Sequence, residues 1–273
     1  MNRKCFLLVA AIAAIVVSAV GQHAQAGRVV WADFEGVMSG SRVHESTATG
    51  GAWQDGGGGG VSADPGTIQD GVAGGFAPAA NGGSNYLRVS DTPGGRDSIL
   101  DFDASVISQL TAGADILLEW DQYYISGFPQ PFLLDNSNPV EGRGEFQYEF
   151  PIDGPGWCPA TTNGLCYRDS AGGRKDSGLV ATPNTWEHFS FRNVIGSGTA
   201  TIGLGGNSVT VTDSFPLNST EYGNGQIGQI WATISSGADM ALDNISLTIV
   251  PEPTALLLSV LGGMGLLVAR RRS

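Results

Sequence analysis

Glycine constrains the fold of this chain more than any other residue. The 273 residues include 41 glycines, and a glycine in a helix interior costs about 1 kcal/mol relative to alanine. Between Arg28 and Ile249 the sequence sustains no apolar 3.6-residue period with helix caps. Because glycine suits tight turns, the sequence predicts an all-β protein with many short connections.

Alternation of apolar and polar residues identifies the clearest strands. In residues 115–125, Trp120 lies on an apolar side that we expect to face the core. Glu119 and Asp121 share the opposite side, which we expect to be half exposed. Residues 186–193 also alternate, with Trp186 and His188 on the side opposite Phe189, so a second regular strand is predicted there.

Short strands of this kind recur along the body of the chain. About ten of them are separated by glycine or proline turns, a pattern typical of sandwiches and barrels. The sequence therefore predicts one antiparallel β-sandwich domain over residues 27–249. A glycine-rich loop is expected at about residues 36–83, with short strands around Trp53 and Ile68.

The N-terminal 26 residues have the features of a secretory signal peptide. Arg3 and Lys4 provide a positive start, and residues 6–20 form an almost unbroken apolar run. Ala24 and Ala26 then supply the small-x-small pattern that signal peptidase accepts. We expect residues 1–26 to be removed during export; the alternative is a membrane anchor that stays uncleaved.

The C-terminal segment combines three unlike elements in a fixed order: a proline-glutamate-proline motif, a 16-residue apolar stretch and a basic cluster. As a helix the apolar stretch is about 24 Å long, somewhat shorter than a bilayer core of about 30 Å. Under the positive-inside bias the basic cluster stays cytoplasmic and the body lies outside. These elements are Pro251, Glu252 and Pro253; residues 254–269; and Arg270, Arg271 and Arg272.

This combination resembles the PEP-CTERM sorting signal of Gram-negative bacteria that make exopolysaccharide. The resemblance covers residues 250–273 and implies that exosortase handles the chain, with processing near the motif. It also implies that residues 254–269 cross the membrane only in transit, before the protein reaches the cell surface or the extracellular space. A plain C-terminal membrane anchor is the alternative.

The body of the chain is strongly acidic. Five of the 14 Lys and Arg residues lie in the two terminal segments, but only one of the 26 Asp and Glu residues does, so the body has a net charge of −16. Such a surface repels nucleic acid and anionic lipid, and we exclude both as partners. It offers many oxygen ligands for calcium.

Two cysteines remain after removal of the signal peptide, which contains Cys5. Cys158 and Cys166 enclose a short loop, and an even cysteine count in an exported chain favours a disulfide. Metal binding by two thiols without histidines nearby is a poor alternative. The sequence predicts a Cys158–Cys166 bridge.

The two ends of the body resemble the jelly-roll, or concanavalin-like, domains of carbohydrate-binding modules. The resemblance is carried by Asp-Phe-Glu-Gly at residues 33–36 and by residues 237–245 near the last strand. It implies that the first and last strands are neighbours and that Glu35 and Asp243 hold a structural calcium. The alternative is that both are solvated acidic residues at strand ends.

A catalytic site is not evident in the sequence. Glu119-Trp120-Asp121 resembles the Glu-x-Asp-x-x-Glu signature of laminarinase-like glycoside hydrolases, but Tyr124 stands where the final glutamate belongs. Retaining hydrolysis needs two carboxylates as nucleophile and acid/base. We therefore predict no catalytic residue. His188 lies within a strand and is expected to have a structural role. A carbohydrate-active enzyme with a divergent site is the alternative.

Aromatic residues fit binding better than catalysis. Trp120, Trp186 and Trp231 lie in patterned strands and are expected to fill the core. The sequence thus predicts a non-enzymatic surface or matrix protein with candidate affinity for extracellular polysaccharide; a purely structural role is a further alternative. The candidate glycan contacts, which we expect to be exposed, are Trp53, Tyr123, Tyr124 and Trp157.

Overall fold

The computed structural model describes residues 27–55, 66–70, 83–90, 97–126, 129–135, 146–153, 162–217, 226–234 and 238–250. Within this part, Arg28–Thr248 form one compact unit. None of the helices in the described ranges is long and apolar enough to cross a membrane. Several predictions fall outside those ranges and stay predictions: the signal peptide, the sorting motif, the apolar stretch 254–269 and the basic cluster.

The larger sheet has eight strands. The order along it is β15, β14, β13, β7, β17, β5 and β4, with β1 also paired to β17. The first and last strands are therefore neighbours, as the resemblance to jelly-roll domains implies. The strands are β1 (Gly27–Ala32), β4 (Thr67–Asp70), β5 (Asn85–Ser90), β7 (Asp115–Ser126), β13 (Trp186–Val194), β14 (Ala200–Leu204), β15 (Asn207–Val211) and β17 (Asp239–Val250).

The second sheet has six strands, and a small third sheet has three. Their orders are β2, β3, β6, β16, β8, β9 and β10, β11, β12. The six are β2 (Thr47–Ala48), β3 (Gly51–Asp55), β6 (Asp97–Phe102), β8 (Pro129–Asp135), β9 (Phe146–Glu149) and β16 (Ile227–Ile234); the three are β10 (Ile152–Asp153), β11 (Gly164–Arg168) and β12 (Arg174–Val180). The helical segments within the described residues are η1 (Val43–Glu45) and α2 (Ala104–Ile107).

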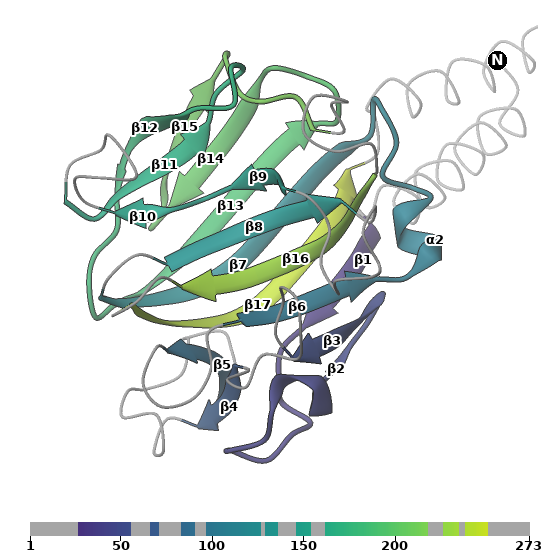
Figure 1. The fold of residues 1–273 in the computed structure, drawn as a ribbon, viewed down its shortest axis with the longest axis vertical. Helices are drawn as coiled ribbons and strands as arrows, with labels where there is room; N and C mark the ends of the chain where they lie inside the picture. Colours follow the sequence, from purple (N-terminus) through teal and green to yellow (C-terminus); the bar gives the residue numbers. More distant parts are fainter. Residues whose placement is uncertain are drawn as a thin grey trace, which may run out of the picture. The chain divides into compact units, whose positions relative to one another are not determined.

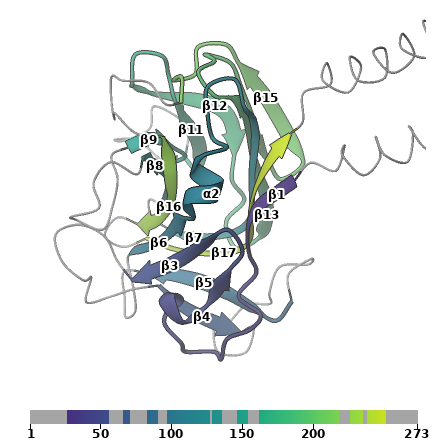
Figure 2. The same ribbon diagram turned by 90° about the vertical axis from the view of Figure 1, so that its right-hand side faces the viewer.

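The two large sheets form separate layers. Figure 1 shows β6, β8 and β16 lying across β7, β13 and β17, and Figure 2 shows β8, β9 and β16 on one side with β13 and β15 on the other. The pairings of β13 with β7 and β14, and of β16 with β6 and β8, are antiparallel. The predicted antiparallel β-sandwich is confirmed.

Aromatic rings join the layers in the core. Trp120 of β7 stacks on Phe189 of β13 with ring centroids 3.9 Å apart. Phe150, which follows β9 in the opposite sheet, has its ring centroid 5.0 Å from that of Phe189 and 4.9 Å from that of Phe191. Tyr148 of β9 also contacts Phe191, at 4.7 Å. These rings bury large apolar surfaces, so they fix which faces of β7 and β13 point inward.

The glycine-rich segment contains more regular structure than a loop. Residues 51–55 form β3, which pairs with β6, and residues 67–70 form β4, which pairs with β5. The short strands predicted around Trp53 and Ile68 are therefore present. The run at residues 56–60 lies outside the described part.

Candidate functional site

Two paired strands present a polar and aromatic surface on the outer face of the larger sheet. Because Trp120 and Phe189 point into the core, their neighbours along β7 and β13 point outward. The antiparallel register places His188 opposite Asp121, and Trp186 opposite Tyr123. We call this surface the outer-face site and define it by Glu119, Asp121, Tyr123, Trp186 and His188.

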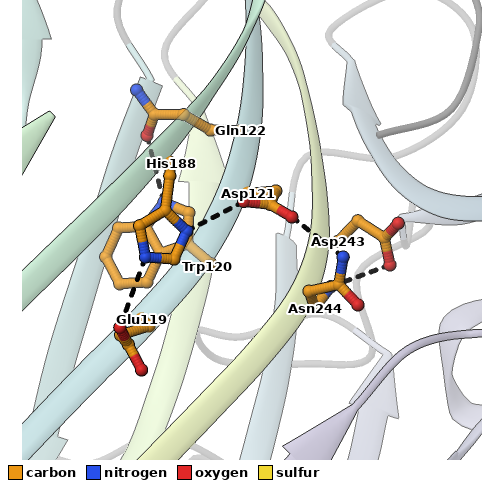
Figure 3. Close-up of polar contacts among 7 residues, drawn as sticks. All are labelled: Glu119, Trp120, Asp121, Gln122, His188, Asp243 and Asn244. Atoms are coloured by element: carbon orange, nitrogen blue, oxygen red, sulfur yellow. Dashed lines mark hydrogen bonds and ion pairs between the residues drawn. The ribbon is translucent and has the colours of Figure 1, made fainter. Parts of the chain in front are cut away.

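An imidazole lies between two carboxylates in the outer-face site. His188 Nδ1 is 2.9 Å from Asp121 Oδ1, and His188 Nε2 is 3.3 Å from Glu119 Oε1, as Figure 3 shows. The side chains of His188, Glu119 and Asp121 are 54%, 30% and 15% exposed. The three groups therefore form a hydrogen-bonded cluster that solvent and ligands can reach.

The two carboxylates control the charge of His188. Partial burial disfavours the imidazolium, but the hydrogen bonds and charges of Asp121 and Glu119 together outweigh burial and raise the pKa of His188 above 6.5. The imidazolium is thus favoured by its partners up to higher pH than in an unfolded chain.

A third strand extends the cluster. Asn244 of β17 donates from Nδ2 to Asp121 Oδ2 over 2.9 Å, so both oxygens of Asp121 accept hydrogen bonds. The φ angle of Asn244 is 52°, in the left-handed region that asparagine tolerates better than most residues. This backbone conformation brings the amide to Asp121 and orients the carboxylate.

Asp243 lies beside Asn244 and is fully buried. Its Oδ1 accepts the backbone N–H of Asn244 at 2.7 Å, whereas its Oδ2 has no hydrogen-bond partner within the described residues. Burial, together with the negative charges of Asp121, Glu35 and Asp33, raises the pKa of Asp243 to about 7. A buried carboxylate with an unsatisfied oxygen indicates strain or an absent partner.

Calcium, which the jelly-roll resemblance implies, fits these residues only in part. Asp243 Oδ2 has no hydrogen-bond partner among the described residues, and a buried carboxylate is costly to ionise unless a cation is bound to it. Glu35 instead accepts the backbone N–H groups of Ser84 and Asn85 at 2.7 and 2.8 Å. In the described part of the chain no three His, Cys, Asp or Glu side chains are arranged to hold a metal ion. The Glu35–Asp243 calcium site therefore stays a prediction.

The aromatic part of the outer-face site consists of Trp186 and Tyr123, both half buried. The ring centroids of Trp186 and Tyr123 are 5.5 Å apart, and the buried Tyr86 of β5 contacts Trp186 at 5.8 Å, both with edge-to-face geometry. These contacts hold the indole in a fixed orientation. The expectation that Trp186 fills the core is wrong, because it shares the outward face with His188.

The structure corrects two other aromatic predictions. Trp53 and Tyr124 are only 4% and 6% exposed, so the expectation that they are exposed glycan contacts is wrong. Trp53 packs on Phe34, and Tyr124 points inward because its neighbour Tyr123 points outward. Trp157 lies outside the described residues.

One observation bears on the predicted Cys158–Cys166 disulfide. Cys166 is buried in β11 and disulfide-bonded. Cys158 lies outside the described residues, so its pairing with Cys166 stays a prediction.

The roles of His188 and Asn244 are not evident from the sequence. Alternation puts His188 on the same face as Trp186, but its carboxylate partners lie 67 and 69 residues earlier in the chain. The strand register that joins them is not visible in any local pattern. The sequence contains one hint of the role of Asn244: asparagine within a strand tolerates a positive φ angle better than most residues do.

Comparison with known proteins identifies no family for this chain. No protein-family model matches it, and no curated protein matches it.

Among solved structures, resemblances are weak. A carbohydrate esterase from the Shiga toxin-encoding bacteriophage phi24B has a TM-score of 0.44 and 13% identity, covering 73% of this chain and 90% of that one. The binding domain of botulinum neurotoxin DC has a TM-score of 0.49 and 7% identity, covering 88% and 52%. A sialidase has a TM-score of 0.43 and 10% identity, covering 81% and 18%. This chain therefore spans about half of the toxin domain and under a fifth of the sialidase, and none of the three determines its function.

Proposed function

We propose that this chain is an exported, non-enzymatic cell-surface or matrix protein whose β-sandwich, of jelly-roll type, binds extracellular polysaccharide. The observation that carries the proposal is the outer-face site, in which the half-buried rings of Trp186 and Tyr123 share the outward face of β7 and β13 with the hydrogen-bonded cluster of Glu119, Asp121 and His188.

This combination suits a sugar for a physical reason. The C–H face of a sugar ring is apolar and gains from contact with an aromatic face, while its hydroxyls need hydrogen-bond partners at the rim. Trp186 supplies the aromatic face, His188 lies two residues further along the same face of β13, and Glu119 lies beyond His188, opposite Ser190. Edge-to-face contacts with Tyr86 and Tyr123 reduce the entropy that Trp186 loses on binding.

Substitution of Trp186 tests the proposed binding. Trp186→Ala should weaken binding of exopolysaccharide from the native host by about 10-fold or more, which is at least about 1.4 kcal/mol. Trp186→Phe keeps a ring and should lose less. Arg192→Ala changes the outward face of the same strand at a distance from the ring and serves as the matched control. If folded Trp186→Ala and Trp186→Phe bind the polysaccharide as tightly as Arg192→Ala does, the proposal is contradicted.

Export and sorting rest on the two terminal segments. We propose that signal peptidase cleaves after Ala26 and that exosortase processes the tail near Pro251-Glu252-Pro253, releasing the protein at the cell surface or into the matrix. The intact mass of protein from the native host should lack both segments. A mass that still includes Arg270, Arg271 and Arg272 would contradict processing of the tail.

A carbohydrate-active enzyme is the second candidate, favoured by one observation. Glu119 and Asp121 are two part-exposed carboxylates that contact one imidazole, and carboxylates and histidine are the side chains that general acid–base catalysis uses most often. The position of the third carboxylate in the glycosidase signature is occupied by Tyr124, which is buried. Asp121→Asn separates the candidates: an enzyme loses turnover of oligosaccharides, whereas a binding protein has no turnover to lose.

A further inference from the structure

We infer that the outer-face site selects glycans with protonated amino groups over their N-acetylated and anionic counterparts, with Glu119 as the carboxylate that receives the ammonium. This inference deepens the proposed function and rests on it. It arises from the charges on this face of the sheet.

Cationic side chains near the site already have carboxylate partners. Arg88, which follows Tyr86 on the same face of β5, donates from Nε and Nη2 to Asp239 over 3.1 and 2.6 Å. Arg192, on the same face of β13 as His188, binds Asp115 with Nη2 at 2.6 Å. Both guanidiniums are thus neutralised in bidentate pairs. Carboxylate or sulfate groups on a glycan would have to displace an existing partner.

Negative charge exceeds positive charge within the site itself. One imidazole serves two carboxylates, Glu119 and Asp121, so at least one negative charge remains when His188 is protonated. The cluster therefore attracts a cation placed beside His188 and Glu119, while the rest of the glycan extends along the strand toward Trp186.

Glu119 is the member of the cluster best able to receive an ammonium. Asp121 already has hydrogen bonds at both oxygens, from His188 and Asn244, and is 15% exposed. Glu119 has one long contact of 3.3 Å to His188 and is 30% exposed. An ammonium on the sugar could therefore bond Glu119 without breaking the Asp121–Asn244 contact.

The body charge of −16 acts in the same direction at longer range. It repels polyanionic glycans and attracts polycationic ones before contact, and this part of the effect is screened by salt. A test must separate such general attraction from recognition at Glu119.

A matched pair of ligands isolates the amino group. Titration calorimetry of the purified protein would compare a glucosamine tetrasaccharide with its fully N-acetylated form, which has the same sugars without the charges, and with a uronate tetrasaccharide. We expect the amino form to bind about 10-fold more tightly than the N-acetylated form, a difference of about 1.4 kcal/mol. The uronate form should not bind measurably.

Two variants with the same charge change test the site. Glu119→Gln should reduce the preference for the amino form to about 3-fold or less, whereas Glu45→Gln, an exposed glutamate in η1, should leave both affinities unchanged. Trp186→Ala should weaken both ligands. Circular dichroism and thermal melting would verify that each variant is folded.

The outcomes separate this inference from the proposal beneath it. Equal affinity for amino and N-acetylated forms, equal effects of Glu119→Gln and Glu45→Gln, or tighter binding of the uronate would each overturn the inference and leave glycan binding standing. If neither these ligands nor the host exopolysaccharide bind, both the inference and the proposed function are wrong.

Discussion

Replacing Asp243 by asparagine should raise the stability of the protein relative to wild type more at alkaline pH than at acidic pH. Burial raises the pKa of the Asp243 carboxyl to about 7 in the folded protein, compared with the ordinary value of 3.8 for an aspartate in water. A difference of about three pKa units corresponds to about 4 kcal/mol. The group binds its proton more tightly when folded, so it contributes stability below about pH 4 and loses that contribution as pH rises to about 7.

Asparagine does not titrate, so this loss should disappear in Asp243→Asn. The NH2 group of the new asparagine is a buried donor, and if it finds no acceptor it costs about 1–3 kcal/mol of stability at every pH. The informative quantity is therefore how the difference in unfolding free energy between variant and wild type changes between pH 4 and pH 8.5. We expect the difference to move by up to about 4 kcal/mol in favour of the variant.

Urea unfolding at four pH values between 4 and 8.5 would measure this difference. Asp103→Asn is the matched control, because Asp103 is an exposed residue at the start of α2 with no side-chain capping bond. Parallel stability curves for Asp243→Asn and wild type would refute the reasoning, since they would show that Asp243 titrates alike in the folded and unfolded states.

The same samples test the predicted calcium site. If Glu35 and Asp243 hold calcium, excess calcium at pH 8.5 should raise the unfolding free energy of wild type and not of Asp243→Asn. No shift in wild type, with or without chelator, would count against calcium without affecting the pH argument.

Two further predictions concern the core and the disulfide. Phe150→Ala should lower the unfolding free energy by about 3–5 kcal/mol in urea, because its ring fills the space between both sheets, whereas exposed Val180→Ala should change it by less than about 0.5 kcal/mol; similar losses for both would contradict the packing. Labelling of the unreduced mature protein should find no reactive thiol if Cys158 and Cys166 are paired, and two labelled thiols would reject the bridge.

Strand faces could be predicted from sequence where the pattern is strictly alternating. Residues 115–125 have the expected faces, because a period of two is a direct consequence of strand geometry. The same rule separates Tyr123 from Tyr124 and puts Trp186 beside His188. Tyr124 and Trp186 differ from the expectations because the position of a residue along its strand, and not its type, decides whether its side chain points inward or outward.

The remaining errors have a different origin. Trp53 lies in a segment whose glycine content suggested a loop, yet its strand β3 is paired with β6 and its ring is buried. The cluster of Asp121, His188 and Asn244 depends on the pairing of three strands that are distant in sequence. Such pairing is decided by how the two sheets pack, and no single segment specifies it.

The measurement that tests the central claim most directly is an NMR titration of the six tryptophan indole N–H signals with host exopolysaccharide. Trp186→Phe would assign the Trp186 signal. Binding at the outer-face site predicts that the Trp186 signal shifts saturably while the signals of buried Trp120 and Trp231 move little. A saturable shift confined to another tryptophan, or no shift at any polysaccharide concentration, would contradict the account.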